Sequence, residues 1–471
     1  MFRSFALILS GNLSNTLLGM LRSLLAAALI SLEDFGIAAT FMVAMAVIEM
    51  VSALGLKQQI VQAREGNDPA FQAALQGFQV LRGLVNGMAL VVLAWPMAWF
   101  FGLSDLVWAY QLVALAPVLR AFEHFDAQRL ARQMNYWPTL ISGALPALGS
   151  LLAVWPLYLM FGDFRVLLFA VLLQAALSVL ASHLVARRPY QLRFDRAIMA
   201  TSLRFGWPIM LNGILMFVIF NGDRMIVGRE LGMATLAVFS MALSLTMAPV
   251  GLLAGVLSKF FLPQLSASKD DPAEFAALSV VTIQAHLVLG ALLVAGVGLL
   301  GGPLLHLALG EKYAAAIPLL TWLALMQGCR VGKGASSVIA LAVARTGNAT
   351  IANIPRVLLL LPAWYAAATG QGLLVVIWLG ILGEILGLVI ALWLVMSRLS
   401  LPWRPLVPVL IVSAVLAGVA IAHASRLATG GWMPDPWTGA GLAILLGLSL
   451  AASRQLRGYV ARRQIRRYDE S

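Results

Sequence analysis

Residues 373–394 read LLVVIWLGILGEILGLVIALWL, an unbroken apolar run in which Glu384 is the one charged residue. A helix rises about 1.5 Å per residue, so about 20 such residues cross the ~30 Å hydrocarbon core of a bilayer. Closed β-barrels also satisfy every backbone polar group in lipid, but their strands alternate apolar and polar residues. The stretch therefore predicts a transmembrane helix.

The rest of the chain has the same character. Its 471 residues are 61% hydrophobic and 11% charged, with a mean hydropathy of +0.90, whereas soluble domains carry about 25% charged residues. We predict an all-α polytopic membrane protein with about fourteen spans. Their expected centres are Leu18, Ala44, Leu90, Leu112, Leu148, Leu172, Leu215, Leu245, Leu292, Leu323, Leu360, Ile381, Val412 and Leu445. We expect residues 1–29 to be the first span rather than a signal peptide, because the apolar run is too long and Arg22 interrupts it.

Charge and cysteine content exclude several functions. A net charge of +12 would indicate nucleic-acid binding in a soluble protein. In a membrane protein it is typical of cytoplasmic loops that face anionic lipid, so no nucleic-acid partner is expected. The single cysteine, Cys329, excludes an internal disulfide, and the five histidines lack the spacing of metal ligands. We predict no metal, no cofactor and no catalytic residue.

Basic residues then give the orientation. With the N-terminus inside, roughly twenty Lys and Arg fall in inward segments and about four in outward ones, the asymmetry of the positive-inside rule. The inward set comprises Lys57, Arg64, Arg129, Arg132, Arg187, Arg188, Arg193, Arg196, Arg204, Lys259, Lys269, Arg345, Arg398, Arg404 and the arginines of the C-terminal tail. We expect both termini in the cytoplasm.

An internal repeat predicts the domain organisation. Asp68-Pro69-Ala70 recurs as Asp271-Pro272-Ala273, each resembling a helix N-cap followed by proline at the first helical position. Upstream, Phe35-Gly36-Ile37 aligns with Leu236-Ala237-Val238, and downstream Arg120 aligns with Arg330. We predict two parallel six-helix lobes at 1–198 and 199–400, and two additional helices with a basic tail at 401–471. Gly143, Gly149, Gly290, Gly296 and Gly298 are expected at helix contacts.

Ionisable residues at membrane depth are costly and normally face a bundle interior or a wet cavity. Cations outnumber carboxylates among them. Guanidinium groups bind phosphates bidentately, so the excess favours an anionic cargo, above all a diphosphate. The predicted binding residues of this cationic cavity are Arg22, Arg82, Arg120, Arg224, Arg330, Lys333 and Arg356, with Asp223, Glu49 and Glu384 as candidates for coupling or gating.

Each of these residues also has a structural interpretation. Arg120, Glu123 and His124 are spaced i, i+3 and i+4, which on one helix face is a self-neutralising cluster. Arg22 and Asp223 occupy aligned positions of the two halves and are predicted to pair. Glu384 either has a coupling or gating role or simply pairs with an arginine.

Two stretches resemble a known family. Glu33-Asp34-Phe35-Gly36-Ile37-Ala38, leading to Leu54-Gly55-Leu56, resembles the opening motif of polysaccharide biosynthesis proteins. Gly222-Asp223-Arg224-Met225-Ile226-Val227-Gly228-Arg229-Glu230-Leu231-Gly232, leading to Val238-Phe239-Ser240, resembles their central motif, with Phe239 where tyrosine is commoner. With the 6+6+2 layout, the chain is similar to Wzx-type oligosaccharide flippases of the multidrug/oligosaccharidyl-lipid/polysaccharide exporter superfamily.

The resemblance implies a V-shaped pair of lobes around a cavity, in the bacterial inner membrane. It implies a transporter, not an enzyme, that flips a polyprenyl-diphosphate oligosaccharide to the periplasmic leaflet for exopolysaccharide, capsule or O-antigen synthesis. Its other partners would be membrane lipid, a polysaccharide polymerase and chain-length machinery. Three alternatives stay open: a cation-coupled multidrug exporter, a lipid II flippase, and a membrane glycosyltransferase or O-antigen ligase.

Overall fold

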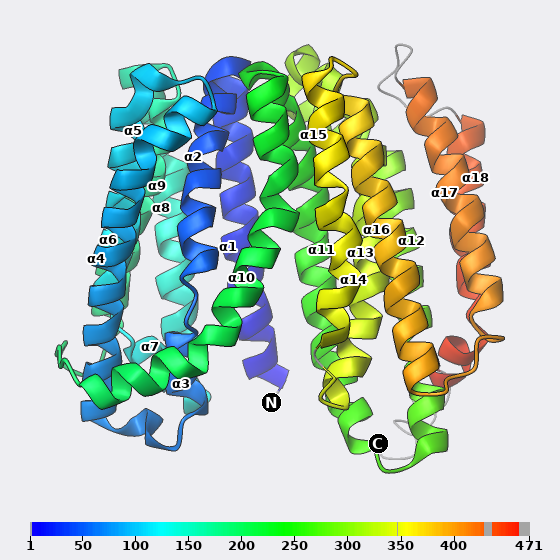
Figure 1. Ribbon diagram of the computed structural model, residues 1–471, viewed down its shortest axis with the longest axis horizontal. Helices are drawn as coiled ribbons and strands as arrows, with labels where there is room; N and C mark the ends of the chain where they lie inside the picture. The colour runs from blue at the N-terminus through cyan, green and yellow to red at the C-terminus, as the bar shows by residue number, and fades with distance from the viewer. Residues whose placement is uncertain (1, 346, 428–435, 461–471) are drawn as a thin grey trace. The chain divides into compact units, whose positions relative to one another are not determined.

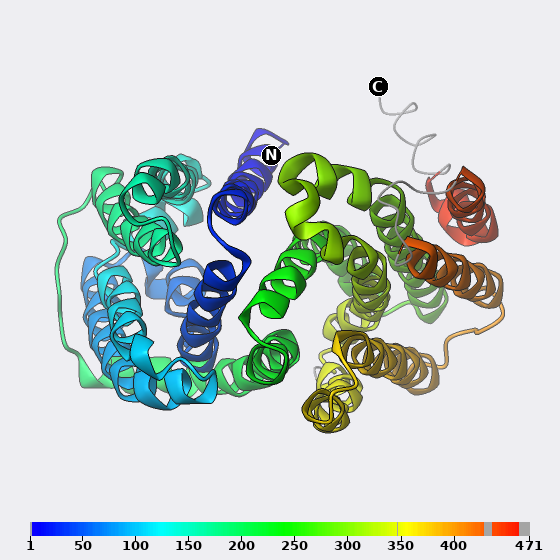
Figure 2. The same cartoon turned by 90° about the horizontal axis from the view of Figure 1, so that it is seen from above.

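The computed structural model describes residues 2–345, 347–427 and 436–460, and the described residues form helices and no strand. This confirms the all-α prediction. The chain divides into two compact units, Met1–Ala237 and Val238–Ser471. Long helices run side by side within each unit (Figures 1 and 2). The lobe boundaries at 198 and 400 are predicted from the internal repeat, which reflects similarity of sequence and not contact between helices. They stay predictions.

The first unit contains ten α-helices and two short 3-10 turns among its described residues. The elements are α1 (Phe2–Leu29), α2 (Leu32–Val51), α3 (Leu56–Gln62), η1 (Arg64–Asn67), α4 (Pro69–Phe100), η2 (Ser104–Leu106), α5 (Val107–Val113), α6 (Leu115–Ala121), α7 (Asp126–Arg132), α8 (Trp137–Phe161), α9 (Arg165–Leu184) and α10 (Arg196–Glu230). Helix α10 contains Pro208, and Figure 1 shows this helix bent.

The second unit begins within α11 and continues to the end of the chain. Its elements are α11 (Met233–Ala267), α12 (Pro272–Leu309), η3 (Gly310–Ala316), α13 (Ile317–Ala342), α14 (Gly347–Leu358), α15 (Leu360–Ala368), α16 (Leu373–Arg398), α17 (Val407–Leu427) and α18 (Pro436–Ala452). The last two pack against each other and against α12.

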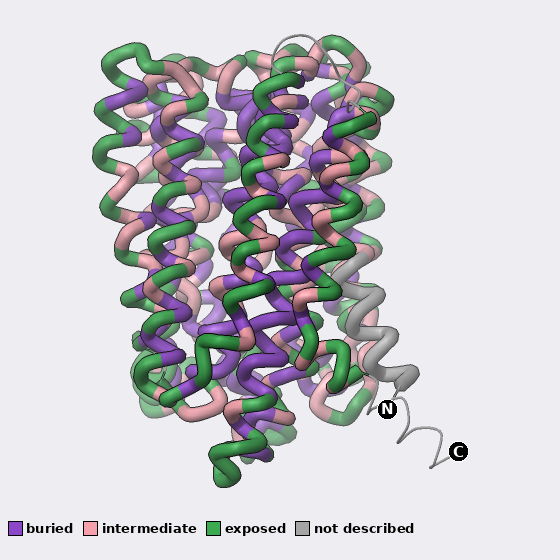
Figure 3. The backbone as a smooth tube through the Cα atoms, turned by 90° about the vertical axis from the view of Figure 1, so that its right-hand side faces the viewer, coloured by how far each residue is buried: buried purple, intermediate pink, exposed green. Residues whose placement is uncertain are grey.

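The pattern of exposed and buried side chains along the helices is typical of a protein whose surroundings are lipid. On α4, Met88 and Val92 are 71% and 73% exposed, whereas Gln76 is 1% exposed. Large apolar side chains therefore face outward and amides face inward, the reverse of a soluble helix. Figure 3 shows exposed and buried residues alternating along the helices.

The described helices also have the length that a membrane requires. Among the described residues, ten helical stretches are long and apolar enough to cross a bilayer, or up to twelve if each of two bent pairs is one span. One of the ten, Pro272–Ala342, includes both α12 and α13. Every predicted span centre, from Leu18 to Leu445, lies inside a helix. The chain is a multi-pass membrane protein, and the count of about fourteen spans stays a prediction.

The two Asp-Pro pairs begin equivalent helices, as the repeat predicts. The Asp68 carboxylate accepts a hydrogen bond from the backbone N–H of Ala70 at the start of α4. The Asp271 carboxylate accepts from Ala273 and Glu274 at the start of α12. In both helices proline follows at the first position, where its missing N–H costs nothing.

Prolines divide two of the spans. Pro117 has no N–H for the carbonyl four residues earlier, and the helix is interrupted at Ala114, between α5 and α6. Pro362 acts in the same way, with the interruption at Leu359 between α14 and α15. The fourth span has a second break at residues 122–125, beyond which α7 turns by 49°.

Two glycines bring α2 into close contact with α10 and with the first residue of α11, within the first unit. A Cβ at Gly36 would lie 1.9 Å from the carbonyl oxygen of Met233, and one at Gly213 would lie 1.9 Å from that of Met50. Gly36 belongs to the first family motif, and Met233 directly follows the second. The two motifs therefore meet in space, and this contact requires glycine at position 36.

The glycines predicted at helix contacts have mixed outcomes. A Cβ at Gly149 would meet Leu177, one at Gly290 would lie 2.9 Å from the Gly328 oxygen, and one at Gly298 would lie 3.2 Å from Leu442. These three predictions are confirmed. The prediction is wrong for Gly143 and Gly296, where a Cβ would meet no atom of the described residues within 4 Å.

Replacing Gly36 by alanine tests the contact between the motifs. The added methyl group meets backbone rather than a flexible side chain, so we expect Gly36→Ala to destabilise the protein by about 1–3 kcal/mol or more. Thermal unfolding of the purified protein in detergent measures the loss. Gly296→Ala is the matched control and should leave the unfolding temperature unchanged or raise it; equal effects of the two changes would contradict the assigned contact.

Candidate functional site

The first unit encloses a cavity of about 820 Å³. Side chains of α1 to α4 and of α6 to α10 line it, together with residues of the break after α6. Five charged side chains contribute to the lining: Glu49, Lys57, Arg82, Arg120 and Glu123. Cations therefore exceed carboxylates by one on its walls.

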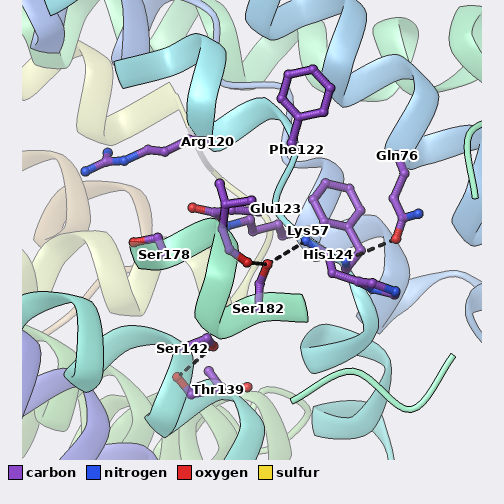
Figure 4. A network of polar contacts seen from close by, with 12 residues as sticks. Lys57, Gln76, Arg120, Phe122, Glu123, His124, Thr139, Ser142, Ser178 and Ser182 are labelled. Atoms are coloured by element: carbon purple, nitrogen blue, oxygen red, sulfur yellow. Dashed lines mark hydrogen bonds and ion pairs between the residues drawn. The ribbon is translucent and has the colours of Figure 1, made fainter. Parts of the chain in front are cut away.

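The break in the fourth span builds one side of the cavity (Figure 4). Three successive backbone N–H groups lose their helical acceptors there, and each finds a side-chain acceptor. His124 N donates to the Ser182 hydroxyl (2.9 Å), Phe125 N to the Gln76 amide oxygen (3.1 Å), and Asp126 N to His124 Nδ1 (3.0 Å). Unsatisfied N–H groups away from water are costly, so these acceptors hold the break in place.

Two ion pairs join the broken span to α2 and α3. Arg120 donates to Glu49 at 2.6 Å, and Lys57 donates to Glu123 at 2.5 Å. The predicted cluster of Arg120, Glu123 and His124 on one helix face is wrong, because α6 ends at Ala121 and the later residues leave its helical path. Glu49 and Lys57 are about half-exposed, so both pairs can open towards the cavity.

Arg82 lies beside the end of α2. Its guanidinium donates to the Ser52 carbonyl at 2.7 Å, and the neighbouring Asn86 amide donates to the Ser52 hydroxyl at 2.8 Å. Ser52 is the C-cap residue of α2, where the helix dipole favours a cation. Arg82 is therefore the lining cation that pairs with backbone rather than with a carboxylate.

Arg22 lies behind the wall of the cavity. It is 7% exposed and donates to the Ser150 hydroxyl at 2.9 Å and to the Gln174 amide oxygen. Gln174 itself lines the cavity. The predicted pair with Asp223 is wrong, since the hydrogen bonds of Arg22 within the described residues go to α8 and α9.

The remaining predicted residues of the first unit lie on α10. Asp223 is buried, and Arg224 donates to the Asn221 side chain at 3.4 Å. They are not among the residues that line the 820 Å³ cavity. Both belong to the second family motif.

The second unit brings together four other predicted residues. Glu384 is fully buried on α16 and accepts from Arg330 at 2.6 Å and from Lys333 at 2.8 Å. Arg356, also fully buried, lies 3.6 Å from the same carboxylate, and Lys333 also donates to Asn353 at 2.6 Å. Glu384 is thus the centre of a cationic cluster, as expected if it pairs with arginine.

Sequence reasoning missed several residues of the first cavity. The sequence places Lys57 among the inward basic residues and Glu123 in a self-neutralising cluster, yet both line the cavity. Gln174, Ser178 and Ser182 are uncharged, so a search for charges could not find them. Their spacing of four residues along an apolar helix is the signal that marks one polar face.

A family comparison gives the context for this site. Residues 25–318 match the model of a family described as "Polysaccharide biosynthesis protein". The chain is 23% identical over 300 residues to the amylovoran biosynthesis protein AmsL of Erwinia amylovora, covering 62% of this chain and 77% of that protein. It is 24% identical over 304 residues to the succinoglycan biosynthesis transport protein ExoT of Rhizobium meliloti (strain 1021), covering 64% of this chain and 61% of that protein. The resemblance seen in the motifs is confirmed.

Solved structures share the fold. The lipid II flippase MurJ in an inward closed conformation has a TM-score of 0.69 at 14% identity, covering 97% of this chain and 99% of that one. An inward-facing multidrug resistance MATE family transporter of the MOP superfamily also has a TM-score of 0.69, at 17% identity, covering 82% of this chain and 94% of that one. At these identities the likeness concerns the fold alone.

Removing the Glu384 carboxylate tests the cluster in the second unit. Glu384→Gln leaves three cations gathered around a neutral amide, and breaking such a buried pair costs about 3–5 kcal/mol. We expect a clear fall in the thermal unfolding temperature in detergent. Glu311→Gln removes a carboxylate that is 82% exposed and should have little effect. Equal stability of the two variants would show that Glu384 does not hold the cluster together.

Proposed function

Because the chain belongs to the polysaccharide biosynthesis protein family, we propose that it is a transporter that flips a polyprenyl-diphosphate-linked oligosaccharide across the bacterial inner membrane. The product would serve exopolysaccharide, capsule or O-antigen synthesis. The single observation that carries the proposal is the cavity of about 820 Å³, which combines Arg82 and Arg120 with neutral hydrogen-bonding side chains of apolar helices. A diphosphate and a sugar need these two kinds of group.

The two arginines bind the diphosphate in this proposal. Arg82 donates one hydrogen bond, to the Ser52 carbonyl. A guanidinium has five N–H donors, so others can bind a phosphate oxygen. Arg120 is held by Glu49, and an incoming diphosphate competes with that carboxylate for the guanidinium. Glu49 is thereby released whenever substrate binds, which makes it our first candidate for coupling to an ion. Asp223 and Glu384 are buried and are assigned to gating.

The second unit contributes positive charge in the proposal. Arg330, Lys333 and Arg356 share one carboxylate, so their summed charge stays positive. The polyprenyl tail stays in the bilayer while the head group crosses by alternating access of the two units. Arg22 holds the cavity-lining Gln174, and Arg224 supports the fold through Asn221.

The alternatives fit the cavity less well. A multidrug exporter for cations needs a cavity dominated by carboxylates, yet Glu49 and Glu123 are each paired with a cation. A lipid II flippase shares the fold, but the family match is to polysaccharide biosynthesis proteins. We propose transport rather than glycosyl transfer, with membrane lipid, a polymerase and chain-length machinery as partners.

Neutralising the cavity arginines tests the proposed substrate. Loss of one charge-assisted hydrogen bond costs about 1.5–3 kcal/mol, which is tenfold or more in binding. We expect Arg82→Gln and Arg120→Gln each to reduce polymer export at least tenfold at normal protein levels, measured in cells whose own copy is deleted. Lys269→Gln, in an exposed turn, is the control and should export normally. Normal export by both cavity variants would refute the proposal.

Cysteine labelling tests the proposed orientation, with both termini in the cytoplasm. In a Cys329→Ser background, a membrane-impermeant maleimide should label Asp105→Cys in intact cells. It should label Lys269→Cys only after the cells are permeabilised, because the positive-inside rule places that turn in the cytoplasm. The reverse pattern would invert the assigned topology.

A further inference from the structure

The cavity of the first unit has two chemically different walls. Its charged residues come from α2, α3, α4, α6 and the break that follows α6. The wall made by α8 and α9 is neutral and polar, with Thr139, Ser142, Gln174, Ser178 and Ser182. Figure 4 shows serines of both α8 and α9 in the region of Arg120 and Glu123. A lining that only held phosphate would not need this second wall.

The orientation of the Gln174 amide follows from its partner. A guanidinium has donors and no acceptor, so the Gln174 atom that contacts Arg22 must be the amide oxygen. The NH₂ group of Gln174 is therefore turned away from Arg22, on a side chain that lines the cavity. Arg22 in turn is fixed by Ser150, whose hydroxyl donates to the Ala170 carbonyl at 2.9 Å. The bond from Arg22 thus fixes the orientation of the amide on this cavity-lining side chain.

Ser178 supplies the complementary group one turn along α9. Its hydroxyl donates to the backbone carbonyl of Gln174 at 2.8 Å, so the lone pairs of the hydroxyl oxygen are left as acceptors. Donors and acceptors side by side, without charge, match sugar hydroxyl groups, which both donate and accept. They do not match an aliphatic or cationic ligand.

We propose that Gln174 and Ser178 form the sugar subsite of the cavity, and that Arg22 is a positioning residue that aims the Gln174 amide. This proposal rests on the proposed function. The wall of α8 and α9 would then distinguish a glycosylated head group from a bare diphosphate. The sugar residue next to the diphosphate contacts α9 while the phosphates contact Arg82 and Arg120. Arg22 then affects sugar recognition without contacting the substrate.

The test compares two ligands on one protein. Purified protein in nanodiscs is titrated with polyprenyl diphosphate bearing one hexose and with polyprenyl diphosphate alone, and the ratio of the two Kd values is the sugar preference. Gln174→Glu keeps the size of the side chain and the bond from Arg22 but replaces the NH₂ donors with an acceptor. We expect the sugar preference to fall at least fivefold, and Ser178→Ala to reduce it by a smaller factor.

Arg22 has a test of its own. Arg22→Lys still donates to the Gln174 oxygen and should retain the sugar preference, whereas Arg22→Met should lose it. A merely structural role would lower the yield of folded protein without changing this ratio. An unchanged ratio in Arg22→Met would overturn the positioning role.

The outcomes separate the two proposals. A wild-type protein that binds both ligands equally, or a Gln174→Glu protein with an unchanged ratio, would overturn the sugar subsite while leaving diphosphate binding intact. Arg120→Gln should weaken binding of both ligands by similar factors. A wild-type protein that binds neither ligand would instead refute the proposed function.

Discussion

The structure depends on satisfying polar groups where no water is available to do so. In the fourth span, the chain leaves helical geometry between Ala121 and Asp126, and Gln76, His124 and Ser182 accept the three N–H groups that are released. Each released donor would otherwise cost several kcal/mol in lipid. Arg120, at the end of α6, reaches α2, and Glu123, within the break, reaches α3. The cavity exists because the break is stabilised in this way.

The same constraint explains how each unit holds its charges. In the first unit, the lining cations pair with carboxylates or with the end of a helix, and Arg22 donates to neutral side chains behind the wall. In the second unit, three cations share the single carboxylate of Glu384. The first arrangement leaves pairs that a ligand can open, whereas the second is closed to solvent at its centre. We therefore place substrate binding in the first.

Much of the fold could be predicted from the sequence because its signals are local. Apolar runs gave the positions of the helices, and the Asp-Pro pairs at 68 and 271 gave two helix starts, since a cap is formed within a few residues. The two family motifs include Gly36 and Gly232, which the packing of α2 and the turn before α11 require. Interactions between distant helices had no such signal.

The site was predicted less completely for the same reason. Counting charges identified Arg82, Arg120 and Glu49 but could not give their partners, so the Arg22–Asp223 pair and the cluster at 120–124 were wrong. No proline marks the break at 122–125, and helical spacing fails across it. Neutral residues such as Gln174 give no signal in a count of charges. Their role emerges only when Arg22 is seen to fix the amide.

The most direct measurement is a structure of the protein with a bound polyprenyl-diphosphate sugar. Our account predicts phosphate oxygens at hydrogen-bonding distance, about 3 Å, from the guanidinium groups of Arg82 and Arg120, with the sugar against α9. Phosphate density elsewhere, with the cavity of the first unit empty and Arg120 still on Glu49, would contradict it.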